Sequence, residues 1–429
     1  FMLINSNEKK LNSNTQISKS DKFNLLIIDD TFPSPKSGFR YIEFTTYLQE
    51  FKKSVIITSG KNIESLDKKS AAIIVQEYKE KFPNLSHKVI LESKKIHIKS
   101  TDLVYLTFLN NTFAILPKIE SAKAPFVFTL YPGGGFLLND PICDHKLKRI
   151  FSSPCFKKVI VTQQVTYDYI LNKGMCSKEK IQMIFGVVMP EISKTDLFTK
   201  KHYWGFDKNR MDICFMAHRY TPYGKDKGYD IFIDVATILH QRYKNIYFHV
   251  IGSFDSKIIN VDTLGDHIKF HGSLDPEDFD NLFKTIDIIL SPNISGQISP
   301  GSFDGFPTAS CIEAALRGSA IFAHDEFNSA ENYFTNEKDI VLIKYDTNDI
   351  IDKIIFYYNH PAALKEIGKN GAHRVKELYS LETQMDPRVN LLHKLAYTEE
   401  PLKNIFFKIF KLNIQWKLHS ILNIFKKHI

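Results

Sequence analysis

The sequence predicts an α/β fold of two doubly wound, Rossmann-like domains that face each other across a central cleft. Three observations favour it. The chain has 429 residues, more than one hydrophobic core commonly serves. Short runs that are apolar at every position alternate with amphipathic segments of helix length, which is typical of a parallel sheet covered by helices. This alternation begins a second time after a polar connection, so we place the domain boundary near residue 195.

The first domain is expected at residues 21–195, after a polar tail at residues 1–20. Its expected strands lie in the runs FNLLIIDD (23–30), SVIITSG (54–60), DLVYLTFL (102–109), PFVFTLYPGGG (125–135), KVIVTQQ (158–164) and IQMIFGVVMP (181–190). These runs are rich in β-branched and aromatic residues, which favour strands. The amphipathic stretch YIEFTTYLQEF (41–51) between the first two runs predicts a helix.

The second domain is expected at residues 196–385, and a basic amphipathic helical tail at residues 386–429. The strand runs of this domain are DICFMAHRY (212–220), IYFHVIGSF (246–254), HIKFHG (267–272), IDIILSPN (286–293), SAIFAHD (319–325) and DIVLIKYD (339–346). Amphipathic segments separate them, for example DKGYDIFIDVATILHQRY (226–243). In folds of this kind, ligands bind where the carboxyl ends of the strands meet the amino ends of the helices.

The composition and the cysteine pattern exclude several classes of protein. The five cysteines are scattered without a CxxC pair, as expected for reduced thiols of a cytosolic protein. No run of about 18 uncharged apolar residues predicts a membrane-spanning helix. The motif DFD at Asp278–Asp280 has the D-x-D spacing of metal-dependent glycosyltransferases, but it follows Pro276 at a helix start. We interpret these aspartates as partners of the helix dipole, and we expect neither a metal nor a cofactor.

The stretch SFDGFPTASCIEAALRG (302–318) predicts a Gly/Pro loop that leads directly into a helix. Thr308 or Ser310 can cap this helix, so its first backbone N–H groups would face an anion such as a diphosphate. Glu313 lies about one turn further in, where its carboxylate can accept hydrogen bonds from the two hydroxyls of a ribose. The alternative is that Glu313 only complements the helix dipole.

Other loops at the expected cleft carry cations or glycines. Arg219 and Lys227 can converge on one diphosphate, although each could equally be a solvated surface cation. Gly38, between the first strand and the first helix, allows the close approach of a ligand or simply forms the turn. The glycines at 133–135 do not match the dinucleotide-binding fingerprint.

Taken together, these stretches resemble the nucleotide-sugar-binding domain of the GT-B glycosyltransferases, in particular the large retaining family 4. The resemblance covers roughly residues 160–390, in the family's order, and rests on HRYTPYGKDKGYDIFIDVATIL, IYFHVIGSF, IKFHGSLDPEDFDNLFKTIDIILSPN, DGFPTASCIEAALRGSAIFAHD and EIGKNGAHRVKELYSLETQ. The first half of the chain matches only in pattern, as expected for the acceptor side.

The resemblance implies roles for individual residues. Arg219 and Lys227 would stabilise the diphosphate as it leaves, an electrostatic role that needs no metal. Glu313 matches the second glutamate of the family's E-x7-E motif and would hold the ribose. The remaining donor contacts implied are the backbone around Phe306, Pro307 and Thr308 at the sugar and distal phosphate, the loop at Gly272 near the base, and Gly38 near the phosphates.

The sequence departs from the family pattern at two places. Eight residues, not seven, separate Asp304 from Glu313, so either Asp304 replaces the first glutamate with a one-residue bulge or Gly305 stands there and the carboxylate is absent. Tyr131 stands where the family commonly has a histidine near the reacting sugar. Tyr131 can hydrogen-bond a sugar hydroxyl but is a poor general base near neutral pH. Asp144 and His145 are the residues that could act as the general base in its place.

The implied activity is retaining, metal-independent transfer of a sugar from a nucleoside diphosphate donor to a glycan or lipid-linked acceptor, in the synthesis of a cell-surface polysaccharide or glycoconjugate. The alternatives are a non-catalytic GT-B binding partner of an active transferase and a nucleotide-sugar epimerase. Residues 401–429 hold six lysines and no acid, so we expect a cytoplasmic protein attached peripherally to an anionic membrane surface. The tail could instead pack on the protein itself. No nucleic-acid recognition motif accompanies the basic charge.

Overall fold

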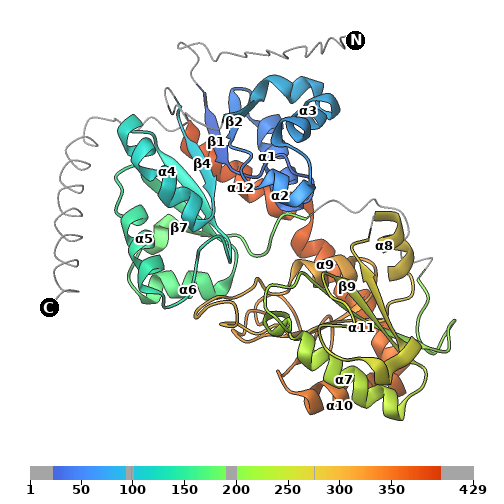
Figure 1. The fold of residues 1–429 in the computed structure, drawn as a ribbon. Helices are drawn as coiled ribbons and strands as arrows, with labels where there is room; N and C mark the ends of the chain where they lie inside the picture. Colours follow the sequence, from blue (N-terminus) through green and yellow to red (C-terminus); the bar gives the residue numbers. More distant parts are fainter. Residues whose placement is uncertain (1–22, 93–97, 99–100, 190–200, 275, 398–429) are drawn as a thin grey trace, which may run out of the picture.

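The computed structural model describes residues 23–92, 98, 101–189, 201–274 and 276–397. Within these residues the chain forms two sheets, one of seven strands and one of six, and every strand pair in them is parallel. Figure 1 shows the two sheets in separate domains, each with helices around it. The predicted fold class of two doubly wound domains is confirmed.

The first sheet has the strand order β3-β2-β1-β4-β5-β6-β7, so its direction of winding reverses between β1 and β4. Its strands are β1 (Leu25–Asp29), β2 (Ser54–Thr58), β3 (Val89–Leu91), β4 (Val104–Thr107), β5 (Phe126–Leu130), β6 (Phe156–Val161) and β7 (Ile181–Met183). The helices of this half are α1 (Gly38–Glu50), α2 (Ile63–Asp67), α3 (Ala71–Lys81), α4 (Leu109–Ala122), α5 (Pro141–Phe151) and α6 (Gln164–Asn172).

The second sheet repeats this topology in the order β10-β9-β8-β11-β12-β13, with its reversal between β8 and β11. Its strands are β8 (Met211–Ala217), β9 (Ile246–Gly252), β10 (Ile268–Gly272), β11 (Ile288–Ser291), β12 (Ala320–His324) and β13 (Val341–Ile343). The helices of this half are α7 (Tyr229–Arg242), α8 (Pro276–Phe283), α9 (Ala309–Leu316), α10 (Thr347–Asn359), α11 (Pro361–Tyr379) and α12 (Leu381–Ala396).

The continuous apolar runs form strands because helices cover both faces of each sheet. Every residue of β1, β2, β4 and β5 is buried, and so is every residue of β11. A strand with only one covered face would alternate apolar with polar residues instead. The observed strands begin within the predicted runs or at their edges, except β3, for which no run was predicted.

The last described helix, α12, packs on the core of the first domain. Met385, Leu391, Leu392 and Ala396 join the hydrophobic core that contains residues of β1, β2 and α1. Figure 1 shows this helix, in red, beside α1, β1 and β4. The predicted start of the tail at residue 386 therefore falls inside a helix that completes the first domain.

None of the described helices is both long enough and apolar enough to cross a membrane. The predicted membrane-binding segment at residues 401–429 lies outside the described residues, as does the polar tail at residues 1–20.

Candidate functional site

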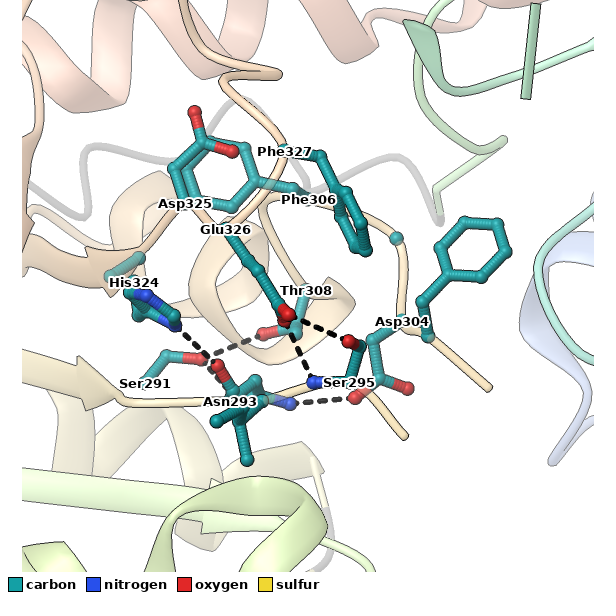
Figure 2. A pocket seen from close by; sticks show the side chains of 14 residues that line it. Ser291, Asn293, Ser295, Asp304, Phe306, Thr308, His324, Asp325, Glu326 and Phe327 are labelled. Carbon is teal, nitrogen blue, oxygen red and sulfur yellow. Dashed lines mark hydrogen bonds between the residues drawn. The ribbon is translucent and has the colours of Figure 1, made fainter. Parts of the chain in front are cut away.

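A pocket lies at the carboxyl ends of β11 and β12, beside the start of α9. It is lined by Ser291, Asn293, Ile294, Ser295, Phe303, Asp304, Gly305, Phe306, Thr308, Ala323, His324, Asp325, Glu326 and Phe327 (Figure 2). This is the edge of a doubly wound sheet at which ligands bind, next to the reversal between β8 and β11. Three of the predicted site residues, Asp304, Phe306 and Thr308, therefore share one pocket.

Lys227 and Asp304 form an ion pair at this pocket. Lys227 Nζ lies 2.6 Å from Asp304 Oδ2, and Asn293 Nδ2 donates to the same oxygen at 2.7 Å. Lys227 is only 8% exposed, so its charge acts where water screens it little. The residues of this pair are 77 positions apart in the chain. The contact places the carboxylate of Asp304 beside the basic residue.

The helix α9 begins after Thr308, where the sequence predicts a helix start. Thr308 is the N-cap residue of α9, and its hydroxyl pairs with Ser310 Oγ at 2.8 Å while making no side-chain cap hydrogen bond. The N–H groups of the first turn of α9 are therefore not capped by Thr308. An anion in the pocket would be favoured by these groups and by the helix dipole.

Glu313 lies within α9 and carries an intrahelical partner. Arg317 Nη1 lies 2.8 Å from Glu313 Oε2, and the same guanidinium reaches Asp280 Oδ1 at 2.6 Å. Arg317, four residues after Glu313, thus pairs with two carboxylates at once: Glu313 and Asp280, the second aspartate of the DFD motif. Asp278 lies in the first turn of α8, as the dipole interpretation predicts, whereas Asp280 pairs with Arg317.

Arg219, the other predicted diphosphate ligand, is exposed on the loop after β8. Its Nη1 donates to the carbonyl of Pro222 at 3.2 Å, and its backbone N–H donates to Ser253 Oγ at 2.8 Å. The side chain folds onto its own loop and does not line the pocket. Gly272 ends β10 with a φ of +64°, and a Cβ there would meet nothing within 4 Å.

Gly38 and Tyr131 belong to the first domain and do not line this pocket. Gly38 is the first residue of α1. Tyr131 directs its hydroxyl into the domain, where it donates to Glu43 Oε2 at 3.0 Å, and the residue is 5% exposed. Burial, together with the nearby Glu43 carboxylate, raises the pKa of Tyr131. In this arrangement its hydroxyl is committed to the core and is not offered to a sugar.

Asp144, one of the two substitutes for a general base, is also engaged elsewhere. Asp144 on α5 accepts a hydrogen bond from Tyr169 Oη at 2.5 Å and pairs with Lys173 Nζ at 2.8 Å. These contacts fix the carboxylate within the first domain. Within the described residues, no group of three or more His, Cys, Asp or Glu side chains is arranged to hold a metal ion.

Several groups at the site were not identified from the sequence. Glu326 accepts hydrogen bonds from the backbone N–H and the hydroxyl of Ser295 at 2.8 and 2.7 Å (Figure 2). Gln163, at the carboxyl end of β6, accepts a hydrogen bond from Phe306 N at 3.0 Å. Glu326 is 31 positions from its partner and Gln163 is 143, so no local pattern could have signalled either contact.

Comparisons with known proteins agree with this architecture. Residues 204–374 match the family model described as Glycosyl transferases group 1. No curated protein matches the sequence. A solved glycosyltransferase from Rickettsia africae ESF-5 superposes with a TM-score of 0.62 at 14% identity, covering 88% of this chain and 100% of that one.

Two further solved structures superpose over nearly their whole lengths. HepE from Anabaena, in complex with UDP and glucose, gives a TM-score of 0.59 at 14% identity over 86% of this chain and 99% of that one. Sucrose-phosphate synthase from Thermosynechococcus elongatus gives 0.58 at 14% identity, covering 86% and 98%. The chain thus has the fold of the GT-B glycosyltransferases, and its second domain matches the glycosyl transferases of group 1.

Proposed function

We propose that the protein is a retaining, metal-independent glycosyltransferase that uses a nucleoside diphosphate sugar and acts on a glycan or lipid-linked acceptor, in the synthesis of a cell-surface polysaccharide or glycoconjugate. The observation that carries the proposal is the buried Lys227, paired with Asp304 beside the start of α9. The matched family model and the UDP-bound structures of HepE support a nucleotide sugar as the donor.

The diphosphate of the donor would lie between Lys227 and the first turn of α9. Lys227 is held before the donor arrives, since Asp304 and Asp226 lie 2.6 and 3.6 Å from its Nζ. A cation that is already in position stabilises the negative charge that develops on the leaving diphosphate without further reorganisation. Arg219 would add a second cation by turning from its own loop toward the phosphates.

Asp304 would serve the sugar as well as the lysine. Both Lys227 and Asn293 use Oδ2 of Asp304, so Oδ1 can accept a hydrogen bond from a sugar hydroxyl. Glu313 would accept hydrogen bonds from the ribose and exchange part of its pairing with Arg317 for them. With Tyr131 committed to Glu43, the leaving diphosphate itself is the group that would take the proton of the acceptor.

The test is differential scanning fluorimetry of the wild type against a panel of nucleoside diphosphates and their sugar conjugates. A ligand that binds only the native state raises the melting temperature, so one nucleotide should stand out. Glu313→Ala and Arg219→Ala should each lose most of its shift. If no nucleotide stabilises the wild type, the donor site is wrong. Binding without transfer to any acceptor would indicate a non-catalytic partner, and an isomerised donor without an acceptor would indicate an epimerase.

A further inference from the structure

The segment between β11 and α9, residues 293–306, contacts the first domain at three successive points, and we refer to it as the docking loop. The first point is a backbone contact. Leu138 N donates to Gly301 O at 2.8 Å. A Cβ at Gly301 would lie 2.0 Å from Leu138 O, and its φ is +80°. Two main chains from different domains therefore meet here so closely that only glycine fits.

The second point is an aromatic side chain that crosses between the domains. Phe303 is 8% exposed and belongs to the hydrophobic core formed by β4, β5 and α5 of the first domain. Its ring lies edge to face with Phe136 at a centroid distance of 5.7 Å. Phe327, from the loop after β12, covers its other side at 5.8 Å. Burial of a phenylalanine in this way stabilises the docked arrangement.

The third point is the hydrogen bond between the docking loop and Gln163. Gln163 lies at the carboxyl end of β6 and is 4% exposed, and its Oε1 accepts from Phe306 N at 3.0 Å. A Cβ at the preceding Gly305 would lie 3.3 Å from Gln163 Nε2, so the amide packs closely against this backbone. Figure 1 shows the orange loops of the second domain directly beside α6, which follows Gln163.

These contacts enclose the residue that holds the buried lysine. Asp304 stands between Phe303 and Phe306, both of which are anchored on the first domain, and its carboxylate carries Lys227 and Asn293. The position of this carboxylate is therefore set from both domains. A change in the way the domains dock would therefore move Asp304, the partner of Lys227, together with the backbone of the docking loop.

We propose that Gln163 is a positioning residue for the donor site, through which the first domain holds the docking loop in the conformation that binds the donor. This inference rests on the proposed function. Gln163 touches Phe306 and acts through the loop. The donor site is then complete only while the two domains are docked, although its ligands belong to the second domain.

The first test measures amide hydrogen exchange of the docking loop in the full-length free protein. Gln163→Leu removes the acceptor of Phe306 N, and exchange in peptides covering residues 294–308 should become about 2- to 12-fold faster, the range that one lost hydrogen bond gives. Gln164→Leu is the matched control, because the side-chain amide of Gln164 donates to Asp168 on the surface of α6 and not to the docking loop. Unchanged exchange in Gln163→Leu would overturn the proposal.

The second test separates positioning from a purely structural contact. Titration with UDP should show about 2- to 12-fold weaker binding in Gln163→Leu and unchanged binding in Gln164→Leu. In the double variant with Asp304→Asn the two losses should not be additive, because both residues act through one loop. Faster exchange with unchanged affinity, or strictly additive losses, would refute the positioning role. If the wild type binds no nucleotide, the proposed function fails, while the exchange data still decide whether the first domain holds the loop.

Discussion

Replacing Gly301 by alanine should disrupt the contact between the domains far more than the same change at Gly296 in the same loop. Both glycines have left-handed backbone, with φ of +80° and +75°. Alanine in that conformation costs about 1–2 kcal/mol at either position. A Cβ at Gly296 would meet nothing within 4 Å, whereas one at Gly301 would lie 2.0 Å from Leu138 O. The pair of variants therefore isolates the collision from the strain.

The additional cost at Gly301 follows from what must move. Separating the two backbones sacrifices the Leu138 N to Gly301 O hydrogen bond, worth about 0.5–1.5 kcal/mol. Drawing the ring of Phe303 out of the first domain costs up to about 1.5–3 kcal/mol more. Gly301→Ala should thus lose about 2–4 kcal/mol beyond the loss in Gly296→Ala, measured as the free energy of unfolding in urea at pH 7. Equal losses in the two variants would refute the idea that the backbones are in contact.

Three further predictions follow from other parts of the molecule. Lys227→Met should weaken UDP binding about 10- to 100-fold in calorimetric titration, because a charge-assisted contact is lost, and adding Asp304→Asn should recover stability without recovering affinity. Leu392→Ala should lower the free energy of unfolding by about 2–5 kcal/mol, since this α12 side chain is fully buried, whereas the exposed Lys394→Ala should change it by less than about 0.5 kcal/mol in the same denaturation assay. Burial and the neighbouring His249 lower the pKa of His271 from 6.5 to about 4. Between these two pH values only the unfolded chain takes up the proton, so the urea concentration at the unfolding midpoint should decrease as the pH is lowered from 6.5 to 4. In the His271→Asn variant this decrease should be smaller.

The strands were predictable because their signal is local. A run such as LLIID in β1 is apolar throughout its buried length, and the burial of both faces follows directly from that composition. The helix start at Thr308 was predictable for the same reason, since loop residues and helix formers meet within a few positions. Neither inference needs knowledge of what lies across the molecule.

The contacts of the candidate site depend on tertiary structure and could not be predicted from the sequence. Gln163 lies at the end of a predicted strand run, and only the docking of the domains gives it Phe306 as a partner. Tyr131 was expected near a sugar because it stands where the resembled family commonly has a histidine. The helix α1 instead places Glu43, 88 positions earlier, where its carboxylate captures the Tyr131 hydroxyl. Periodicity shows that a position is buried, but not which distant group it meets.

The return of α12 to the first domain has a consequence for synthesis on the ribosome. The core around β1, β2 and α1 includes side chains of Leu381–Ala396, which leave the ribosome long after β7 has ended at Met183. At about 5–20 residues per second, the intervening chain takes roughly 10–40 s to make. Throughout that interval the nascent first domain exposes the apolar surface that α12 later covers, so it depends on the second domain being made before it can close its own core.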